Sequence, residues 1–187
     1  ALIKTIDIRK LQMKVHFNNA DPDKIIKTIH ALSNVDVDDA RFTQTIDQIN
    51  TYIYGCKKVI IVGAVYPEML SLYYMEDMLM MGKFIHSSPV NTSIGEVEND
   101  TLVLMISFTG RVYIEHYDEI MKFKENNVSI VGIGNPNSLP EQIHLTKFLE
   151  LPFKGDVEIE NACIPLVLQY MKYRYYQTYG DTKHVCI

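Results

Sequence analysis

Hydrophobic residues recur with the period of an α-helix through the first third of the chain. Three helices are expected there, over about residues 3–17, 22–32 and 38–54. Asp21 followed by Pro22 is a typical start for the second of them, an N-cap residue followed by proline at the first helical position. The third helix places apolar residues at steps of four, three and four, at Phe42, Ile46, Ile49 and Ile53.

The pattern changes to short, continuous apolar runs after residue 57. Lys58–Gly63, Thr101–Ser107 and Val128–Ile133 are rich in β-branched residues and lack alternating polar positions. Such runs are typical of strands buried on both faces, as in a parallel sheet. Weaker strands are expected at Lys83–His86 and His144–Leu151.

Helical segments separate these strands. They are expected over about residues 67–81, where Pro67 can start a helix, over 111–125 and over 160–179. Strands that alternate with helices predict βαβ units with right-handed crossovers. The fold class is therefore α/β, a doubly wound parallel sheet in a three-layer α/β/α arrangement with additional N-terminal helices.

Composition narrows the range of functions. The chain has 187 residues, enough for one compact domain, and a net charge of −5, which makes it a poor match to nucleic acid or an anionic membrane. Its longest apolar runs fall far short of the roughly 20 residues that span a bilayer. An odd, widely spaced set of three cysteines favours a reducing cytoplasm over a disulfide framework. The six histidines show no metal-ligand spacing, so neither a metal nor a cofactor is expected.

The loops that follow the strands carry the candidate chemistry, because ligands of doubly wound sheets bind at the carboxyl ends of the strands. The loop after the second long strand contains Ser107, Thr109, Gly110 and Arg111. Backbone amides at a helix start attract anions, the hydroxyls add donors, and arginine adds a charged fork. This loop is a candidate phosphate cradle. The alternative, that the hydroxyls merely cap the helix, is equally consistent with the sequence.

The other two loops are less informative. Gly63 is the only glycine where a dinucleotide-binding fold needs three, so no Rossmann cofactor site is expected. The third loop, residues 134–140, contains Ser138, which either faces the same crevice or caps the segment that begins at Leu139.

The order of these features resembles the sugar isomerase (SIS) domain. The matching segments read VGAVYP, ISFTGRV and GIGNPNSLPE, and the resemblance covers about residues 40–180. It implies a domain that binds a phosphorylated sugar or carbohydrate derivative, with residues 1–37 as a helical lead-in and residues 38–187 as the SIS-like domain. The implied ligand-binding residues are Gly63, Tyr66, Ser107, Thr109, Gly110, Arg111 and Ser138.

The lead-in resembles the linker helices of RpiR-type transcriptional regulators. In that family a helix-turn-helix head precedes the sugar-phosphate sensor. The chain begins at Ala1 and shows no such head, so DNA is expected as a partner only through a head absent from this chain.

The chain departs from the family pattern at several positions. Val65 and Pro67 replace a glycine and a serine of the first loop, Val112 replaces a threonine of the second, and Leu139–Pro140 reverses the order in the third. About half of the family's phosphate-binding groups remain. Each lost hydrogen bond to a charged ligand is worth about 1.5–3 kcal/mol, so either the ligand differs or sensing is lost.

Three functions are compatible with these residues: a sensor domain, a sugar-phosphate isomerase of the same fold, and a degenerate dimerisation module. An isomerase needs a positioned base, and Glu115, His116, Glu141 and His144 are candidates, but none lies in a motif that fixes its direction. We expect a sensor rather than an enzyme.

Two apolar helices predict a homodimer. Five methionines lie between residues 69 and 81, and the last helix carries five tyrosines between residues 170 and 179. This exceeds what one sheet face needs to cover it, and aromatic residues are enriched at interfaces. No membrane partner is expected.

Overall fold

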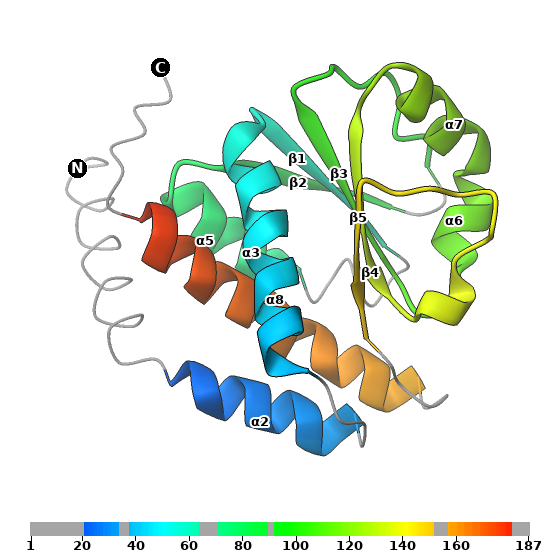
Figure 1. Cartoon of the computed structure of the whole chain (residues 1–187). Helices are drawn as coiled ribbons and strands as arrows, with labels where there is room; N and C mark the ends of the chain where they lie inside the picture. Colours follow the sequence, from blue (N-terminus) through cyan, green and yellow to red (C-terminus); the bar gives the residue numbers. More distant parts are fainter. Residues whose placement is uncertain (1–20, 34–37, 64–70, 90–91, 152–156, 181–187) are drawn as a thin grey trace.

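A five-stranded parallel sheet forms the middle layer of the computed structural model, which describes residues 21–33, 38–63, 71–89, 92–151 and 157–180 (Figure 1). Its strands are β1 (Lys58–Gly63), β2 (Phe84–Pro89), β3 (Thr101–Ser107), β4 (Ser129–Gly134) and β5 (Lys147–Glu150). Their order is β2-β1-β3-β4-β5, with every neighbouring pair parallel. The predicted fold class is confirmed.

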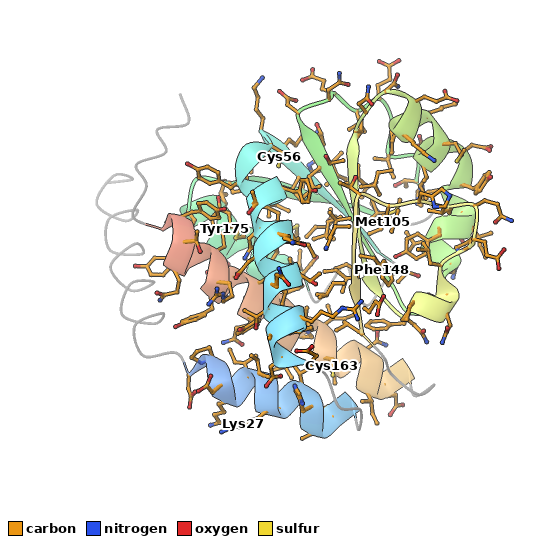
Figure 2. The ribbon with its side chains drawn as sticks, in the orientation of Figure 1. Lys27, Cys56, Met105, Phe148, Cys163 and Tyr175 are labelled. Carbon is orange, nitrogen blue, oxygen red and sulfur yellow. The ribbon has the colours of Figure 1, made fainter. Side chains whose placement is uncertain are left out.

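Helices cover both faces of this sheet (Figure 1). One face is covered by α3 (Asp39–Gly55), α5 (Leu72–Met80) and α8 (Val157–Tyr179), with α2 (Pro22–Ser33) packed against α8, and the other by α6 (Arg111–Glu115) and α7 (Tyr117–Glu125). Each face has its own apolar core. Alternate residues of one strand enter different cores, since Leu104 packs in the α3–α8 core and Met105 packs beneath α6 and α7. Figure 2 shows Met105 within the sheet.

The largest differences in extent from the sequence expectation concern the helix after β3 and the strands β2 and β5. The helix expected over 111–125 is interrupted at His116, whose φ of −104° and ψ of 20° leave the helical region. β2 extends to Pro89, whereas β5 begins only at Lys147. The segment before β5 forms a turn and not a strand. Ile143 donates its N–H to the Pro140 carbonyl there and buries its side chain in the core beneath α7.

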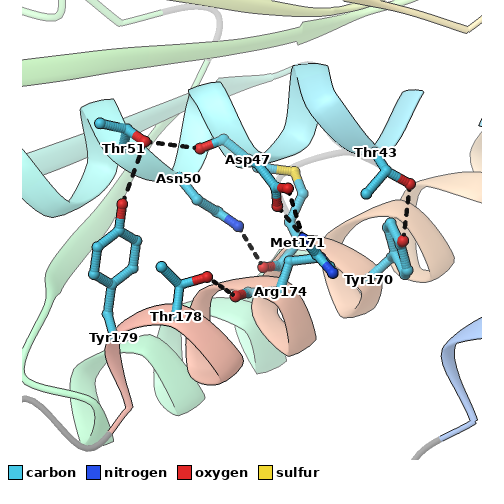
Figure 3. A network of polar contacts seen from close by, with 9 residues as sticks. All are labelled: Thr43, Asp47, Asn50, Thr51, Tyr170, Met171, Arg174, Thr178 and Tyr179. Carbon is cyan, nitrogen blue, oxygen red and sulfur yellow. Dashed lines mark hydrogen bonds and ion pairs between the residues drawn. The ribbon is translucent and has the colours of Figure 1, made fainter. Parts of the chain in front are cut away.

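A line of polar contacts joins α3 to α8 (Figure 3). Arg174 donates two hydrogen bonds to the Asp47 carboxylate, from Nε at 2.9 Å and from a terminal nitrogen at 2.6 Å. The buried Asn50 amide donates to the Met171 carbonyl at 2.9 Å. Hydroxyl pairs complete the line at both ends, Thr43 with Tyr170 and Thr51 with Tyr179. The two helices run in the same direction and meet once per turn.

The N-terminal helix α2 packs against α8 and shares its core. Ile26 and Ile29 are buried there beside Phe42. The helix expected over residues 3–17 lies outside the described residues, so the domain boundary at residue 37 remains a prediction. Within the part of the chain that the structure describes, no helix is both long enough and apolar enough to cross a membrane.

Candidate functional site

The carboxyl ends of β1 and β3 lie side by side, and the chain leaves them toward opposite faces of the sheet. β1 is followed by α5 on the α3–α8 face, and β3 is followed by α6 on the other face. Ligands of this class of fold bind at such a switch point. Gly63 ends β1 and Ser107 ends β3 at this point, and both are buried. Tyr66 lies outside the described residues.

The ends of β3 and β4 approach each other closely beside the crevice. Gly134 is the register partner of Ser107. A Cβ atom added at residue 134 would lie 1.8 Å from the Ser107 carbonyl oxygen. Only glycine fits between these strands at that point.

A second close approach joins the two loops that follow these strands. Gly110, the N-cap of α6, has a φ of 77°, in the left-handed region that glycine adopts without strain. A Cβ atom at residue 110 would lie 2.3 Å from the Ser138 carbonyl oxygen. The structure therefore brings the backbones of Gly110 and Ser138 together.

The Ser138 hydroxyl is engaged within its own loop. It donates a hydrogen bond to the Asn135 carbonyl at 2.7 Å, and the Asn135 side chain accepts from the Asn137 N–H at 2.9 Å. These bonds shape the short 3₁₀ turn η1 (Pro136–Ser138). A phosphate needs hydrogen-bond donors, and in this structure the hydrogen of the Ser138 hydroxyl is directed to the Asn135 carbonyl instead.

Thr109 and Arg111 are the solvent-exposed members of the predicted site. Arg111 Nε lies 2.5 Å from the Glu115 carboxylate, one turn further along α6. An exposed ion pair of this kind is worth less than about 1 kcal/mol. An incoming anion can therefore compete with Glu115 for the guanidinium at low cost.

His116, a candidate base, is instead part of a buried clamp. Its side chain is 3% exposed, and Nδ1 lies 2.6 Å from Glu119 Oε2. The other oxygen of Glu119 accepts hydrogen bonds from the Ser93 hydroxyl at 2.6 Å and from the N–H groups of Ile94 and Gly95 at 2.8 and 3.3 Å. The clamp fixes the connection between β2 and β3 onto α7.

The same contacts shift the pKa of Glu119. Burial by itself raises this pKa, but the hydrogen bonds from His116, Ser93 and Gly95 outweigh burial and hold the pKa below its usual range. A carboxyl whose folded-state pKa is depressed contributes stability above its unfolded-state pKa. That contribution is lost as the pH falls through the folded-state value.

Glu119→Gln is expected to lower the free energy of unfolding by about 1–2 kcal/mol at pH 7, because it removes a charged acceptor of several hydrogen bonds. The difference in unfolding free energy between variant and wild type should narrow as the pH falls below the ordinary pKa of a glutamate and through the lower folded-state pKa of Glu119, where the wild-type carboxyl becomes protonated. Urea unfolding at several pH values measures both effects. Glu125→Gln, at an exposed position of the same helix, is the control. A difference in unfolding free energy that stays constant with pH would show that the charge of Glu119 does not contribute to stability.

The other candidate bases are exposed or paired. Glu115 holds Arg111, and Glu141 is exposed. His144 lines a hollow with Lys124, Ser129 and neighbouring residues around the amino end of β4. This hollow lies at the opposite end of the strands from Gly63 and Ser107.

The roles of two residues are not evident from the sequence. Gly134 reads there as part of a loop, because its contact with Ser107 depends on the β3–β4 register, which no local pattern reveals. Glu119 lies three residues after His116 at a helix start, a spacing similar to a capping box, and this spacing is the signal that points to a local clamp. Among the described residues, no group of three or more His, Cys, Asp or Glu side chains is arranged to hold a metal ion.

Comparisons with known proteins identify the architecture. No protein-family model matches the chain, and no curated protein matches it either. Among solved structures, an Escherichia coli CFT073 protein in complex with a phosphorylated sugar has a TM-score of 0.64 at 13% identity, covering 90% of this chain and 92% of that one. The sugar isomerase domain of an RpiR transcription factor from Sphaerobacter thermophilus has a TM-score of 0.59 at 13% identity, with 83% and 89% covered.

Two further solved structures are similar to this chain. Vibrio vulnificus NanR complexed with ManNAc-6P has a TM-score of 0.63 at 14% identity, covering 92% of this chain and 69% of that one. A Methanococcus jannaschii protein, for which a 3-hexulose-6-phosphate isomerase function was inferred from its structure, has a TM-score of 0.62 at 18% identity. The match covers 83% of this chain and 89% of that one. Both regulators and isomerases thus share this architecture. The resemblance seen in the sequence is confirmed at the level of the fold: this chain has the fold of the sugar isomerase domain.

Proposed function

We propose that this chain is the effector-binding domain of an RpiR-like transcriptional regulator. It binds a phosphorylated sugar or a related carbohydrate derivative in the crevice between β1 and β3, acts in the cytoplasm as a homodimer, and reaches DNA through a separate helix-turn-helix head. The ligand favours one dimer geometry, and the N-terminal helices transmit that geometry.

The observation that carries this proposal is the loop Ser107–Gly110 at the switch point of the sheet. Its hydroxyl residues and its helix start lie at the carboxyl end of β3, held in place by the contact of Gly110 with Ser138. Similar folds bind sugar phosphates in other proteins: the solved NanR structure contains ManNAc-6P. Among the described residues, Cys56 and Cys163 are free thiols.

Thr109→Val is expected to weaken the binding of a sugar phosphate about ten- to hundredfold, because it removes a hydroxyl donor to a charged group. Isothermal calorimetry with a panel of pentose and hexose phosphates that includes ManNAc-6P measures the affinity. Thr178→Val, at an exposed position of α8, is the matched control and should leave the affinity unchanged. Equal binding by wild type and Thr109→Val would move the phosphate site elsewhere.

The alternative function is a sugar-phosphate isomerase. The similar Methanococcus jannaschii structure, for which a 3-hexulose-6-phosphate isomerase function was inferred, favours this alternative. The placement of the candidate bases opposes this alternative. His116 is enclosed with Glu119, and His144 lies at the opposite edge of the sheet. Proton transfer requires a base within hydrogen-bond reach of the sugar carbon.

No exchange of the proton beside the sugar carbonyl is therefore expected for common hexose or pentose phosphates. NMR in heavy water detects such exchange directly. Exchange that increases with protein concentration and disappears in Glu115→Gln or Glu141→Gln would replace the sensor with the enzyme.

A further inference from the structure

The aromatic surface of α8 is largely used within the chain. Tyr170 and Tyr175 are buried, and Tyr179 stacks on Tyr54 with ring centroids 4.1 Å apart. Three of the five tyrosines that the sequence places on this helix are therefore packed within the chain.

The outward face of α5 keeps its apolar side chains in solvent. Tyr73 is 80% exposed, and Leu72 and Leu79 are 53% and 55% exposed. The methionines Met75 and Met78 of this helix point inward, since Met78 is buried and Met75 packs against the same core. We call Leu72, Tyr73 and Leu79 the α5 face.

A groove of about 350 Å³ lies beside the α5 face, between α5 and α8. Its walls include Tyr74, Pro165 and Leu168. Proline inside a helix cannot donate a hydrogen bond and disturbs the preceding turn, which prevents α8 from packing evenly at this point. The polar lining includes Lys172 and Asp77, which form a partly buried ion pair.

We propose that this surface is an interface with a second copy of the chain, in which Tyr73 of each copy enters the α5–α8 groove of the other. This inference rests on the homodimer of the proposed function and specifies its contact face. A two-fold interface must be self-complementary, because the same patch occurs on both sides. Tyr73 itself lines the rim of the groove, so the projecting ring and the hollow that would receive it occur on one patch.

Charge favours a second copy at this position. Each copy has a net charge of −5, so a contact surface that carries few charges keeps the repulsion between two copies small. Glu76 is the only charged residue among the exposed side chains of α5. By contrast, the outward positions of α7 carry several charges, at Asp118, Lys122, Lys124 and Glu125.

The polar lining of the groove suits a phenol. Asp77 and Lys172 neutralise each other, so no net charge is buried when the groove closes. A tyrosine hydroxyl can donate to a carboxylate or accept from an ammonium or amide group, and Asp77, Lys172 and Gln169 offer these groups. A purely aliphatic side chain would leave them without a new partner.

Two substitutions in the full chain test the interface by sedimentation equilibrium. Tyr73→Ser removes the projecting ring, and Gln169→Trp fills the groove from its rim. Each is expected to raise the dimer dissociation constant by at least about thirtyfold, the change typical of a central interface residue. Tyr117→Ser, which removes a partly exposed tyrosine from α7, is the control and should change the constant less than about twofold. Circular dichroism and thermal unfolding verify that each variant is folded.

The outcomes separate this inference from the proposed function. A dimer that both variants leave intact would overturn the interface, and so would a wild-type chain that remains monomeric at high micromolar concentration. Calorimetry with sugar phosphates on the same samples reports the crevice independently. Binding by a monomer would thus sustain the ligand site while removing the interface.

Discussion

Replacing Gly134 by alanine is expected to lower the melting temperature by about 10 °C. The added Cβ would lie 1.8 Å from the Ser107 carbonyl oxygen, so the ends of β3 and β4 must separate. The obstacle is backbone rather than a flexible side chain, which places the cost near the upper end for overpacking, about 3 kcal/mol. In a domain of this size each kcal/mol corresponds to about 2–4 °C. Calorimetric or fluorescence melting measures the shift.

Gly55→Ala is the matched control for this change. Gly55 is the last residue of α3, and no atom lies within 4 Å of a Cβ added there. Alanine is favoured over glycine in a helix, so the melting temperature should stay constant or rise slightly. Equal melting of the two variants would show that β3 and β4 are not packed as described.

Gly110→Ala is expected to cost about 2–3 kcal/mol of folding free energy and to weaken sugar-phosphate binding more than about tenfold. Two effects add at this position. The backbone has a φ of 77°, which is strained for alanine, and the Cβ would lie 2.3 Å from the Ser138 carbonyl oxygen. Relief of that contact moves the start of α6 away from residues 134–140, and the proposed anion site is built from these two segments.

Gly95→Ala separates the two effects. Gly95 has a φ of 79°, nearly the same as Gly110, but no atom lies within 4 Å of a Cβ there. This variant should show the backbone strain alone, about 1–2 kcal/mol, with sugar-phosphate affinity unchanged. Chemical unfolding and calorimetry on both variants make the comparison. Affinity losses of equal size would indicate that the contact with Ser138 does not organise the crevice.

The layered architecture is predictable from local patterns because its buried strands are continuous apolar runs. Thr101–Ser107 has the predicted limits, since all seven of its residues are buried and no polar position blurs its ends. The predicted length of β5 is too great, because the apolar side chains before it pack in the core without joining the sheet. Ile143 is buried but belongs to a turn, and hydrophobicity alone does not distinguish these cases.

The candidate site is predictable only in its sequence positions. Strand ends and hydroxyl residues identify the Ser107–Gly110 loop, but the pairing of Gly110 with Ser138 depends on how two distant loops meet. Similarly, the ion pair of Arg111 with Glu115 follows from a four-residue helical spacing and not from the residues of the loop itself. The burial of His116 depends on the β2–β3 connection, which has no regular pattern in the sequence.

The polar line between α3 and α8 restricts how this molecule can move. A purely apolar pair of helices can slip by one turn, about 5.4 Å, and repack at modest cost. Such a slip here would separate Asp47 from Arg174 and leave the buried Asn50 amide without the Met171 carbonyl. A buried donor without an acceptor costs about 1–3 kcal/mol, in addition to the loss of the ion pair. A one-turn slip of α3 along α8 is therefore disfavoured, and the two helices should move over the sheet together as one rigid body.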